Sequence, residues 1–347
     1  MVCCLLWKMV ALFMKKLVAA VVASHVAIVT GLHFYKKQRI LESSPYKTKS
    51  EEEKLLDWLT DLDGVPLVKD IASNVRKLDG FNTRHDDIYI VSYPKSGTTW
   101  VSELAYNIVH KLDIPKAKSK PLDERVPYLE WVHSNHHQLE SMPHSTPRII
   151  KSHLPLKLLP NSITNGKHKI VYIMRNPRDV CVSYYHFTKM IQMVGYNGEF
   201  SNFFDLFLVG SVAYGSWPSH VQEYYTYSLS SGASSNVLFI TYEELVKDPI
   251  KTIEKLAQFL DTPLSSEQLQ LLSYMCSFSS MKNNPSSNYQ WLAVSGFLKD
   301  DAQFLRKGTV GDWQNHFSPD MASSLDSLLA DSIKDDGLLK LIDYEKS

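Results

Sequence analysis

The sequence predicts an α/β domain in which helices flank a parallel sheet on both faces, and three features of the chain predict it. Short segments rich in β-branched residues alternate with segments of helical periodicity. Residues 169–174 (KIVYIM) are continuously apolar, as strands buried on both faces are. Residues 88–109 run from a strand through a glycine turn into a helix. Such sheets bind ligands at the carboxyl ends of their strands, so we expect the functional residues there.

The elements of this domain are predicted in order from Ser50. Ser50 and Glu53 have the pattern of a helix-capping box. The helix that follows carries an apolar side made of Leu55, Leu56, Trp58 and Leu59. Residues 113–128, rich in lysine and proline, predict a mobile loop. Further strands are predicted at 148–153, 169–174 and 237–241, and further helices at 177–185, 250–260 and 319–342.

An apolar run of membrane-spanning length, residues 17–35, precedes the domain. Lysines and arginines are equally numerous before and after this run, so the positive-inside rule predicts no orientation for a membrane span. We favour an anchor at 1–40, a linker at 41–49 and a domain at 50–347 that faces the cytosol. The chain has no Asn-x-Ser/Thr acceptor (x not Pro) and no disulfide pattern, which argues against export. A cleaved signal peptide, a peripheral helix and a soluble cytoplasmic protein are the alternatives.

Composition restricts the class of ligand. Formal net charge is zero and 44% of the 347 residues are hydrophobic, which permits a sizeable core. Neutrality gives no indication of a nucleic-acid or acidic-polymer partner, so an anion site must be a local basic cluster. The four cysteines have no metal-ligand spacing.

The segment around Lys95 has the character of an anion-binding loop. Pro94 ends a strand, Lys95 to Gly97 form a tight turn, and Thr98 begins a helix. The turn gathers backbone N–H groups, two hydroxyls and an ammonium group, which suits a phosphate-like anion. The alternative is an ordinary strand–turn–helix with a lysine in the turn. A nucleoside-triphosphate P-loop is excluded, because its lysine follows the glycine, whereas Lys95 precedes Gly97.

Two further strand ends carry candidate chemistry. Lys151 and His153 are two residues apart and therefore point to the same side. His153 can accept a proton from an alcohol or phenol, although a lone histidine at a strand end is more often structural. Arg175 and Ser183 suit a second phosphate, although Arg175 can instead pair with Asp179.

Near the carboxyl end, Arg306-Lys307-Gly308 places two cations beside a glycine. Such a loop also suits a phosphate, although a charge cluster of this kind is often a solvated surface.

Four strings, in this order, resemble the cytosolic-type sulfotransferase family over about residues 55–318. They are YPKSGTTW (93–100), KSHLP (151–155), RNPRDVCVSYYHF (175–187) and RKGTVGDWQNHF (306–317). The resemblance implies the sulfotransferase fold, which is similar to that of the P-loop nucleotide kinases. It also implies transfer of a sulfuryl group from 3'-phosphoadenosine 5'-phosphosulfate (PAPS). The implied acceptor is a hydroxyl or amine of a small phenolic or steroid-like molecule.

The same resemblance implies a role for each residue. The loop of Lys95 to Trp100 holds the 5'-phosphosulfate, and His153 is the general base. The 3'-phosphate is held by Arg175, Ser183 and Arg306 to Gly308. The adenine wall is formed by Trp100, Tyr242 and Phe278, together with Cys276, Ser277 and Met281. The catalytic set is Lys95, Lys151, His153 and Ser183, and the acceptor contacts are Tyr128, Lys151 and His153. The nucleotide-binding set is Lys95, Ser96, Gly97, Thr98, Thr99, Trp100, Arg175, Ser183, Tyr242, Cys276, Ser277, Phe278, Met281, Phe304, Leu305, Arg306, Lys307 and Gly308. No metal is expected, because a sulfuryl group carries less charge than a phosphoryl group and lysines can replace magnesium.

The chain departs from the family pattern at three places. Cys276 stands where threonine is usual, which removes a hydroxyl from the adenine wall. Tyr128 stands where phenylalanine is common, which we expect to add a hydroxyl to the pocket mouth. Gln314, Ser318-Pro319 and Ser323 replace the family's dimer motif, so we expect a weak dimer or a monomer.

Two other functions remain as alternatives. One is a PAPS- or PAP-binding protein without turnover, which the presence of Lys95, Lys151, His153 and Ser183 disfavours. The other is a membrane-anchored carbohydrate sulfotransferase, which the KSHLP and RKGxxGDW strings disfavour. An apolar acceptor pocket is predicted from the aromatic residues Tyr128, Trp131, Phe187, Tyr196 and Phe200.

Overall fold

A parallel sheet in the order β4-β3-β5-β6 lies at the centre of the described chain. This computed structural model describes residues 50–131, 139–230 and 236–342, so the predicted anchor and linker lie outside the described residues. The strands are β3 (Ile88–Val91), β4 (Ile149–Ser152), β5 (Lys169–Met174) and β6 (Val237–Thr241). The prediction of a parallel sheet between helices is therefore confirmed: β5 and β6 have the predicted bounds, and β4 is one residue shorter at each end than predicted.

Helices follow the strands in the alternation that parallel pairing requires. In chain order they are α2 (Glu51–Leu56), α3 (Lys69–Val75), α4 (Thr98–Val109), α5 (Ile114–Lys118), α6 (Leu122–Arg125), α8 (Asn161–Thr164), α9 (Pro177–Met190), α10 (Phe200–Leu208), α11 (Trp217–Ser228), α12 (Tyr242–Lys247), α13 (Pro249–Phe259), α14 (Ser266–Met275), α15 (Phe278–Lys282), α16 (Gln290–Val294), α17 (Pro319–Ser332) and α18 (Asp336–Leu341). Short 3₁₀ helices lie at Leu78–Gly80, Leu156–Leu158 and Asp312–Asn315. Within the described ranges, no helix is long and apolar enough to cross a membrane.

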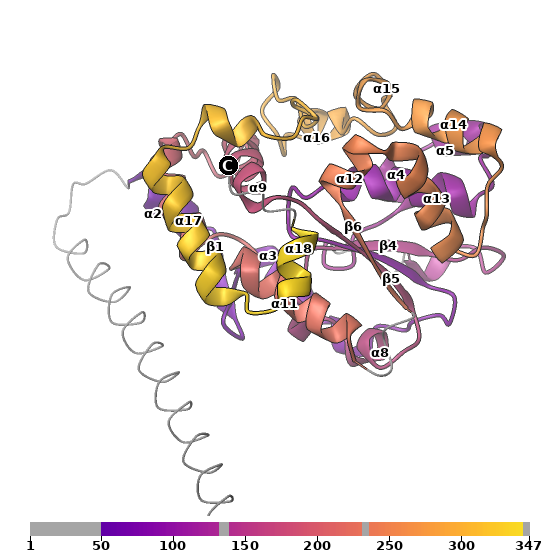
Figure 1. The fold of residues 1–347 in the computed structure, drawn as a ribbon, viewed down its shortest axis with the longest axis horizontal. Coiled ribbons are helices and arrows are strands. Elements are labelled where there is room, and N and C mark those ends of the chain that lie inside the picture. Colours follow the sequence, from indigo (N-terminus) through magenta and orange to yellow (C-terminus); the bar gives the residue numbers. More distant parts are fainter. Residues whose placement is uncertain (1–49, 132–138, 231–235, 343–347) are drawn as a thin grey trace, which may run out of the picture. The chain divides into compact units, whose positions relative to one another are not determined.

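The sheet has a hydrophobic core on each face. Ile88 and Ile90 of β3 pack in one core with residues of α4 and α13. Tyr89 and Val91 point the opposite way, into a second core shared with α3 and α11. Figure 1 shows α4, α12 and α13 on one side of the strands and α3 and α11 on the other. Burial on both faces explains why β3 is apolar throughout and why β5 is apolar from Ile170 to Met174.

A β-hairpin that we did not predict precedes the sheet. β1 (Leu59–Leu62) pairs antiparallel with β2 (Val65–Val68) across a two-residue turn. Asp63 and Gly64 in this turn both have positive φ, at 52° and 76°. An Asp-Gly pair between apolar residues is a hairpin signal, so the sequence did carry this information.

Three predicted elements have different bounds in the structure. The capping box of Ser50 and Glu53 is present, but α2 ends at Leu56 because Leu59 begins β1. The prediction of a mobile loop at 113–128 is wrong. This segment contains α5 and α6, and the buried side chains of Leu122 and Arg125 hold it in place. The expected helix at 319–342 is divided into α17 and α18, because Asp335 caps a new helix by accepting from Gly337 N and Leu338 N.

Candidate active site

The loop between β3 and α4 has a backbone that requires glycine. Gly97 has φ 112°, and a Cβ at this position would lie 2.9 Å from Ile173 Cδ1 and from Tyr242 Cδ2. The turn is therefore compressed against β5 and α12, and it leaves the first N–H groups of α4 without a side-chain cap. Buried Thr98 hydrogen-bonds through Oγ1 to Ser92 Oγ at 2.6 Å, which fixes the start of the helix. A helix N-terminus of this kind is suited to an anion.

Lys95 projects from this loop into an aromatic clamp. Its Nζ lies 4.4 Å from the ring centroid of Phe187 and 4.0 Å from that of Phe304. Burial, together with the nearby charges of Arg175 and Arg306, lowers the pKa of Lys95 to about 7. An anion bound here restores the charged form of the amine.

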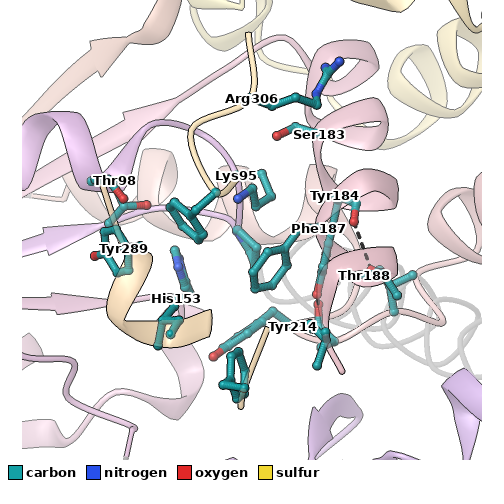
Figure 2. Close-up of a pocket in the computed structure, with 18 of the residues that line it drawn as sticks. Lys95, Thr98, His153, Ser183, Tyr184, Phe187, Thr188, Tyr214, Tyr289 and Arg306 are labelled. Atoms are coloured by element: carbon teal, nitrogen blue, oxygen red, sulfur yellow. Dashed lines mark hydrogen bonds between the residues drawn. The ribbon is translucent and has the colours of Figure 1, made fainter. Parts of the chain in front are cut away.

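The second basic cluster comes from three separate segments. Arg175 follows β5, Ser183 lies on α9, and Arg306 lies on the loop after α16. The Arg175 guanidinium stacks 4.2 Å from the Tyr242 ring centroid and donates through Nη2 to Thr309 O at 2.9 Å. In Figure 2, Ser183 and Arg306 lie on one side of Lys95 and His153 lies on the other.

Asp179 pairs with Arg175, as the alternative stated from the sequence allowed, and it also makes contacts that we did not predict. It is 3.7 Å from Arg175 Nη2, which is a loose contact. Its two carboxylate oxygens instead accept from Gly311 N at 2.7 Å and Trp313 N at 3.0 Å. Asp179 therefore anchors the basic loop to α9. No local pattern in the sequence indicates a contact between Asp179 and residues so far along the chain.

Asp312 balances the cations of the same loop. Arg306 donates to Asp312 Oδ2 at 2.5 Å, and Lys307 donates to Oδ1 at 2.6 Å. The loop is thus held in shape by internal ion pairs, and both cations stay next to the cavity that Gly308 also lines.

The predicted adenine wall is formed in part. Trp100 and Tyr242 meet edge to face, with centroids 5.6 Å apart, and both line the cavity with Phe278 and Met281. Cys276 is buried in the core at the end of α14, and Ser277 caps α15 by accepting from Ser280 N. Three members of the predicted nucleotide-binding set are not among the described residues that line the cavity: Cys276, Ser277 and Ser96.

His153 lies just past the end of β4, and its backbone is fixed on both sides. Its N–H donates to Glu130 Oε1 at 2.8 Å, and its carbonyl accepts from His220 Nε2 at 3.0 Å. Tyr172 OH lies 2.8 Å from the other nitrogen of His220, which completes the support. Neither Glu130 nor His220 stood out in the sequence, because their partners are far away along the chain.

The hydrogen bonds of the His153 ring decide its tautomer. Nδ1 lies 2.8 Å from Ser92 O, and a carbonyl can only accept, so Nδ1 carries the proton. Nε2 therefore has its lone pair free for a donor, and Tyr128 OH lies 3.2 Å from it. Burial, above all, lowers the pKa of His153 to about 3, so the ring is neutral at ordinary pH. The free lone pair on Nε2 suits a general base, whereas the low pKa makes the ring a weak base until an anion bound beside it favours the charged form.

Lys151 differs from the sequence-based expectation. It is fully buried, and its Nζ donates to Asp123 and, at 2.7 Å, to Tyr289 OH. Nζ also lies 4.3 Å from the Tyr128 ring centroid, so Lys151 and His153 do reach the same tyrosine. Asp123 already compensates the ammonium charge. Lys151 is not among the described residues that line the cavity.

A single cavity of about 440 Å³ connects these groups. Lys95, Thr98, His153, Ser183 and Arg306 all line it. Beyond His153 it continues into an apolar compartment lined by Leu55, Trp58, Leu59, Val68, Ile71, Trp131, Phe187, Ile191, Met193, Val194, Val212, Leu292 and Phe297. Asp70 and Asn74 of α3 add polar groups to this lining.

Two residues of the predicted acceptor pocket lie elsewhere. Tyr196 is fully buried, with its hydroxyl directed to Glu199 O, and Phe200 packs on Phe317. Tyr128, Trp131 and Phe187 do line the cavity. The compartment's other walls, at residues 55–74, were missed because a sequence of apolar residues does not distinguish a pocket from a core.

Known proteins share this arrangement. The sulfotransferase-domain family matches residues 85–337. Human sulfotransferase 1E1 is 38% identical over 282 residues, which cover 80% of this chain and 94% of that protein. The chain belongs to the cytosolic-type sulfotransferase family. Human sulfotransferase 2A1 is 39% identical to this sulfotransferase over 265 residues, or 76% of this chain and 90% of that protein.

Solved structures resemble this sulfotransferase as well. Retinol dehydratase in a complex with retinol and PAP aligns with a TM-score of 0.72 and 26% identity, over 84% of this chain and 98% of that one. Mouse sulfotransferase SULT7A1 complexed with PAP aligns with a TM-score of 0.68 and 30% identity, over 82% of this chain and 98% of that one. The enzyme class and the fold predicted from the sequence are thus confirmed.

Proposed function

We propose that this sulfotransferase moves the sulfuryl group of PAPS to the hydroxyl of a small, flat or elongated apolar acceptor. The observation that carries the proposal is that Lys95 and a neutral His153 line one cavity, between a basic cluster and an apolar compartment. The basic side suits a nucleotide with phosphates at both ends, and the apolar side suits the acceptor.

Unsatisfied polar atoms support the nucleotide end of the proposal. Among the described residues, Ser96 Oγ and Arg175 Nε are buried without a hydrogen-bond partner. Buried polar groups of this kind are uncommon, and a phosphate bound beside Arg175, which lines the cavity, would satisfy its Nε. We assign the 5'-phosphosulfate to the loop of Lys95 to Trp100. We assign the 3'-phosphate to Arg175, Ser183 and Arg306 to Gly308.

The proposed chemistry needs placement and charge rather than a covalent enzyme intermediate. PAPS supplies a sulfuryl group whose bond to the 5'-phosphate breaks as its bond to the acceptor oxygen forms. His153 Nε2 takes the acceptor proton, while its Nδ1–H remains on Ser92 O. Lys95, in its charged form, stabilises the negative charge that develops on the departing phosphate.

The acceptor class follows from the second compartment. Its walls are mostly aliphatic and aromatic, which favours a lipophilic body over a sugar. Asp70 and Asn74 can hydrogen-bond a polar group at the far end of the acceptor. Retinol and androsterone occur with retinol dehydratase in its solved complexes, and both are lipophilic alcohols. Phenols, steroid-like alcohols and polyene alcohols are therefore the proposed acceptors, with aryl amines as a variant.

Two alternatives have less support. A PAP-binding protein without turnover would not need a neutral histidine in the cavity with an Nε2 lone pair that can accept a proton. A carbohydrate sulfotransferase would need a more polar acceptor compartment than the one present.

The test is a transfer assay with PAPS labelled in its sulfate and a panel of acceptors: a naphthol, a hydroxysteroid, retinol, an aryl amine and a disaccharide. We expect label in the apolar hydroxyl compounds and none in the disaccharide. Label confined to the disaccharide would contradict the proposed acceptor class. PAP binding without labelled product from any acceptor would favour the binding-protein alternative.

A further inference from the structure

Of the described residues that line the cavity, two are lysines, and they differ in what surrounds the amine. Lys307 Nζ donates to Asp312 Oδ1 at 2.6 Å, so its ammonium has a carboxylate as counter-charge. Lys95 Nζ instead lies between two uncharged rings, those of Phe187 and Phe304. Within the part of the chain that the structure describes, no carboxylate pairs with Lys95.

These surroundings favour the uncharged form of the Lys95 amine when no anion is bound. Burial and the charges of Arg175 and Arg306 lower the pKa of Lys95 to about 7, although the two rings attract a cation. Above this pH most Lys95 side chains therefore carry a free lone pair. A lysine that is desolvated beside other cations is the kind of amine that enzymes use as a nucleophile toward carbonyl carbons.

The cavity also offers a carbonyl compound a place beside this amine. The Phe187 ring contacts Lys95 Nζ and is at the same time a wall of the apolar compartment, as Figure 2 shows for the two side chains. A lipophilic molecule in the compartment can therefore reach the amine along this ring. Lys151 is not in this position, because its Nζ donates to Asp123 and it is not among the described residues that line the cavity.

We propose that, without bound nucleotide, Lys95 forms a reversible imine with a lipophilic aldehyde that occupies the apolar compartment. This goes beyond sulfuryl transfer and rests on the proposed function only for the use of that compartment. The Nζ lone pair attacks the carbonyl carbon, and the carbonyl oxygen leaves as water with the two amine hydrogens, so no oxidant or reductant is consumed. The aldehyde that corresponds to an alcohol acceptor then competes with PAPS for the enzyme.

Trapping of the imine in the whole chain tests the inference, with 2-naphthaldehyde as the probe. Borohydride adds a hydride to the imine carbon and leaves a stable secondary amine, which peptide mapping by mass spectrometry assigns to a lysine. We expect Lys95 to be the most heavily labelled lysine at pH 8. PAP at about ten times its Kd should lower that label about tenfold, because it leaves about a tenth of the enzyme free. Label spread over other lysines without enrichment at Lys95, or label that PAP does not lower, would overturn the inference.

Lys307→Arg is the matched control for Lys95→Arg, because each removes one amine that lines the cavity and keeps a positive charge. We expect the aldehyde label protected by PAP to disappear in Lys95→Arg and to remain in Lys307→Arg. An equal loss in both variants would contradict the inference. Thermal unfolding of each variant verifies that the fold is intact.

The pH dependence of the label gives a second readout on the unmodified protein. Label on Lys95 should increase about tenfold from pH 6 to pH 8 and change little above, following the uncharged fraction of an amine with a pKa of about 7. An ordinary exposed lysine would instead gain about tenfold per pH unit up to about pH 10. The second pattern at Lys95 would overturn the inference.

Trapping requires no turnover, so this inference and the proposed function can fail separately. Label on Lys95 in a protein that sulfates no acceptor of the panel would support the imine and refute the proposed function. Sulfation of the apolar acceptors without enrichment of label at Lys95 would refute the imine alone.

Discussion

Lys95 is an amine whose charge near neutral pH depends on what lies beside it. Burial and the charges of Arg175 and Arg306 lower its pKa to about 7, so the free enzyme carries this ammonium below pH 7 and loses it above. An anionic nucleotide favours the charged form, so binding above pH 7 must take up a proton.

This linkage gives a prediction about pH. Affinity for PAP should fall as pH rises from 7 toward 9, at most about tenfold per pH unit, because each unit lowers the charged fraction about tenfold. Calorimetry in two buffers of different ionisation enthalpy measures the proton uptake. In Lys95→Arg the guanidinium stays charged, so the uptake at pH 8 should largely disappear. Equal uptake by both proteins would assign it to another group.

For single residues, the sequence predicted which residues belong to the site better than it predicted what surrounds each of them. Lys95, His153 and Arg306 line one cavity, and the sequence singled each of them out because it lies in a short string next to a strand end or a glycine. Lys151 was expected in the open site, and its partner Asp123 was not anticipated. The two residues are 28 positions apart and meet where the segment after α6 pairs with β4 at Tyr128 and Lys151, which no local pattern reveals.

The loop from Phe304 to Gly311 is the element on which the proposed second phosphate site depends. Gly308 has φ 70°, and a Cβ there would lie 2.1 Å from Phe278 Cδ2, a ring of the predicted adenine wall. A side chain at position 308 and the Phe278 ring cannot both occupy this space. The loop therefore needs glycine for both its backbone and its packing.

Gly308→Ala should lower PAP affinity by at least about tenfold, because either the loop or Phe278 must move. Gly311→Ala is the control: Gly311 also has a positive φ, 84°, but no atom within 4 Å of the added carbon. That variant should mainly lose stability, by roughly 1–2 kcal/mol from the left-handed backbone. Titration of PAP and thermal unfolding separate the two effects. Equal losses of affinity would refute the steric explanation.

Helices and strands were predicted well where an apolar pattern extends over many residues or where a capping residue marks the start of a helix. The strand at 169–174 and the helix beginning at Pro177 appear as expected, as does the capping box at Ser50. Residues 113–128 were misjudged because α5 and α6 are too short for a visible period. Their stability comes from tertiary burial, which local propensity does not report.

At the scale of the whole domain, the sheet brings together groups that are far apart in sequence. β3, β4 and β5 end at one edge, where Lys95, His153 and Arg175 follow them. The apolar compartment is lined mainly by residues from 55–74 and 184–214, and these apolar residues could not be distinguished from core residues in advance.

Two expectations about the whole protein stay predictions. The anchor at 1–40 lies outside the described residues. The weak dimer or monomer is expected because the usual motif is replaced, and Gln314, Pro319 and Ser323 at those places are exposed.

The central claim is that one cavity holds the sulfate donor against a base, His153, that deprotonates the acceptor. The most direct test is to measure labelled sulfate transfer and PAP binding for His153→Ala together. The account predicts that turnover falls about 10²–10⁴-fold while PAP affinity stays close to that of the wild type. Near-normal turnover in this variant, with PAP still bound, would contradict it.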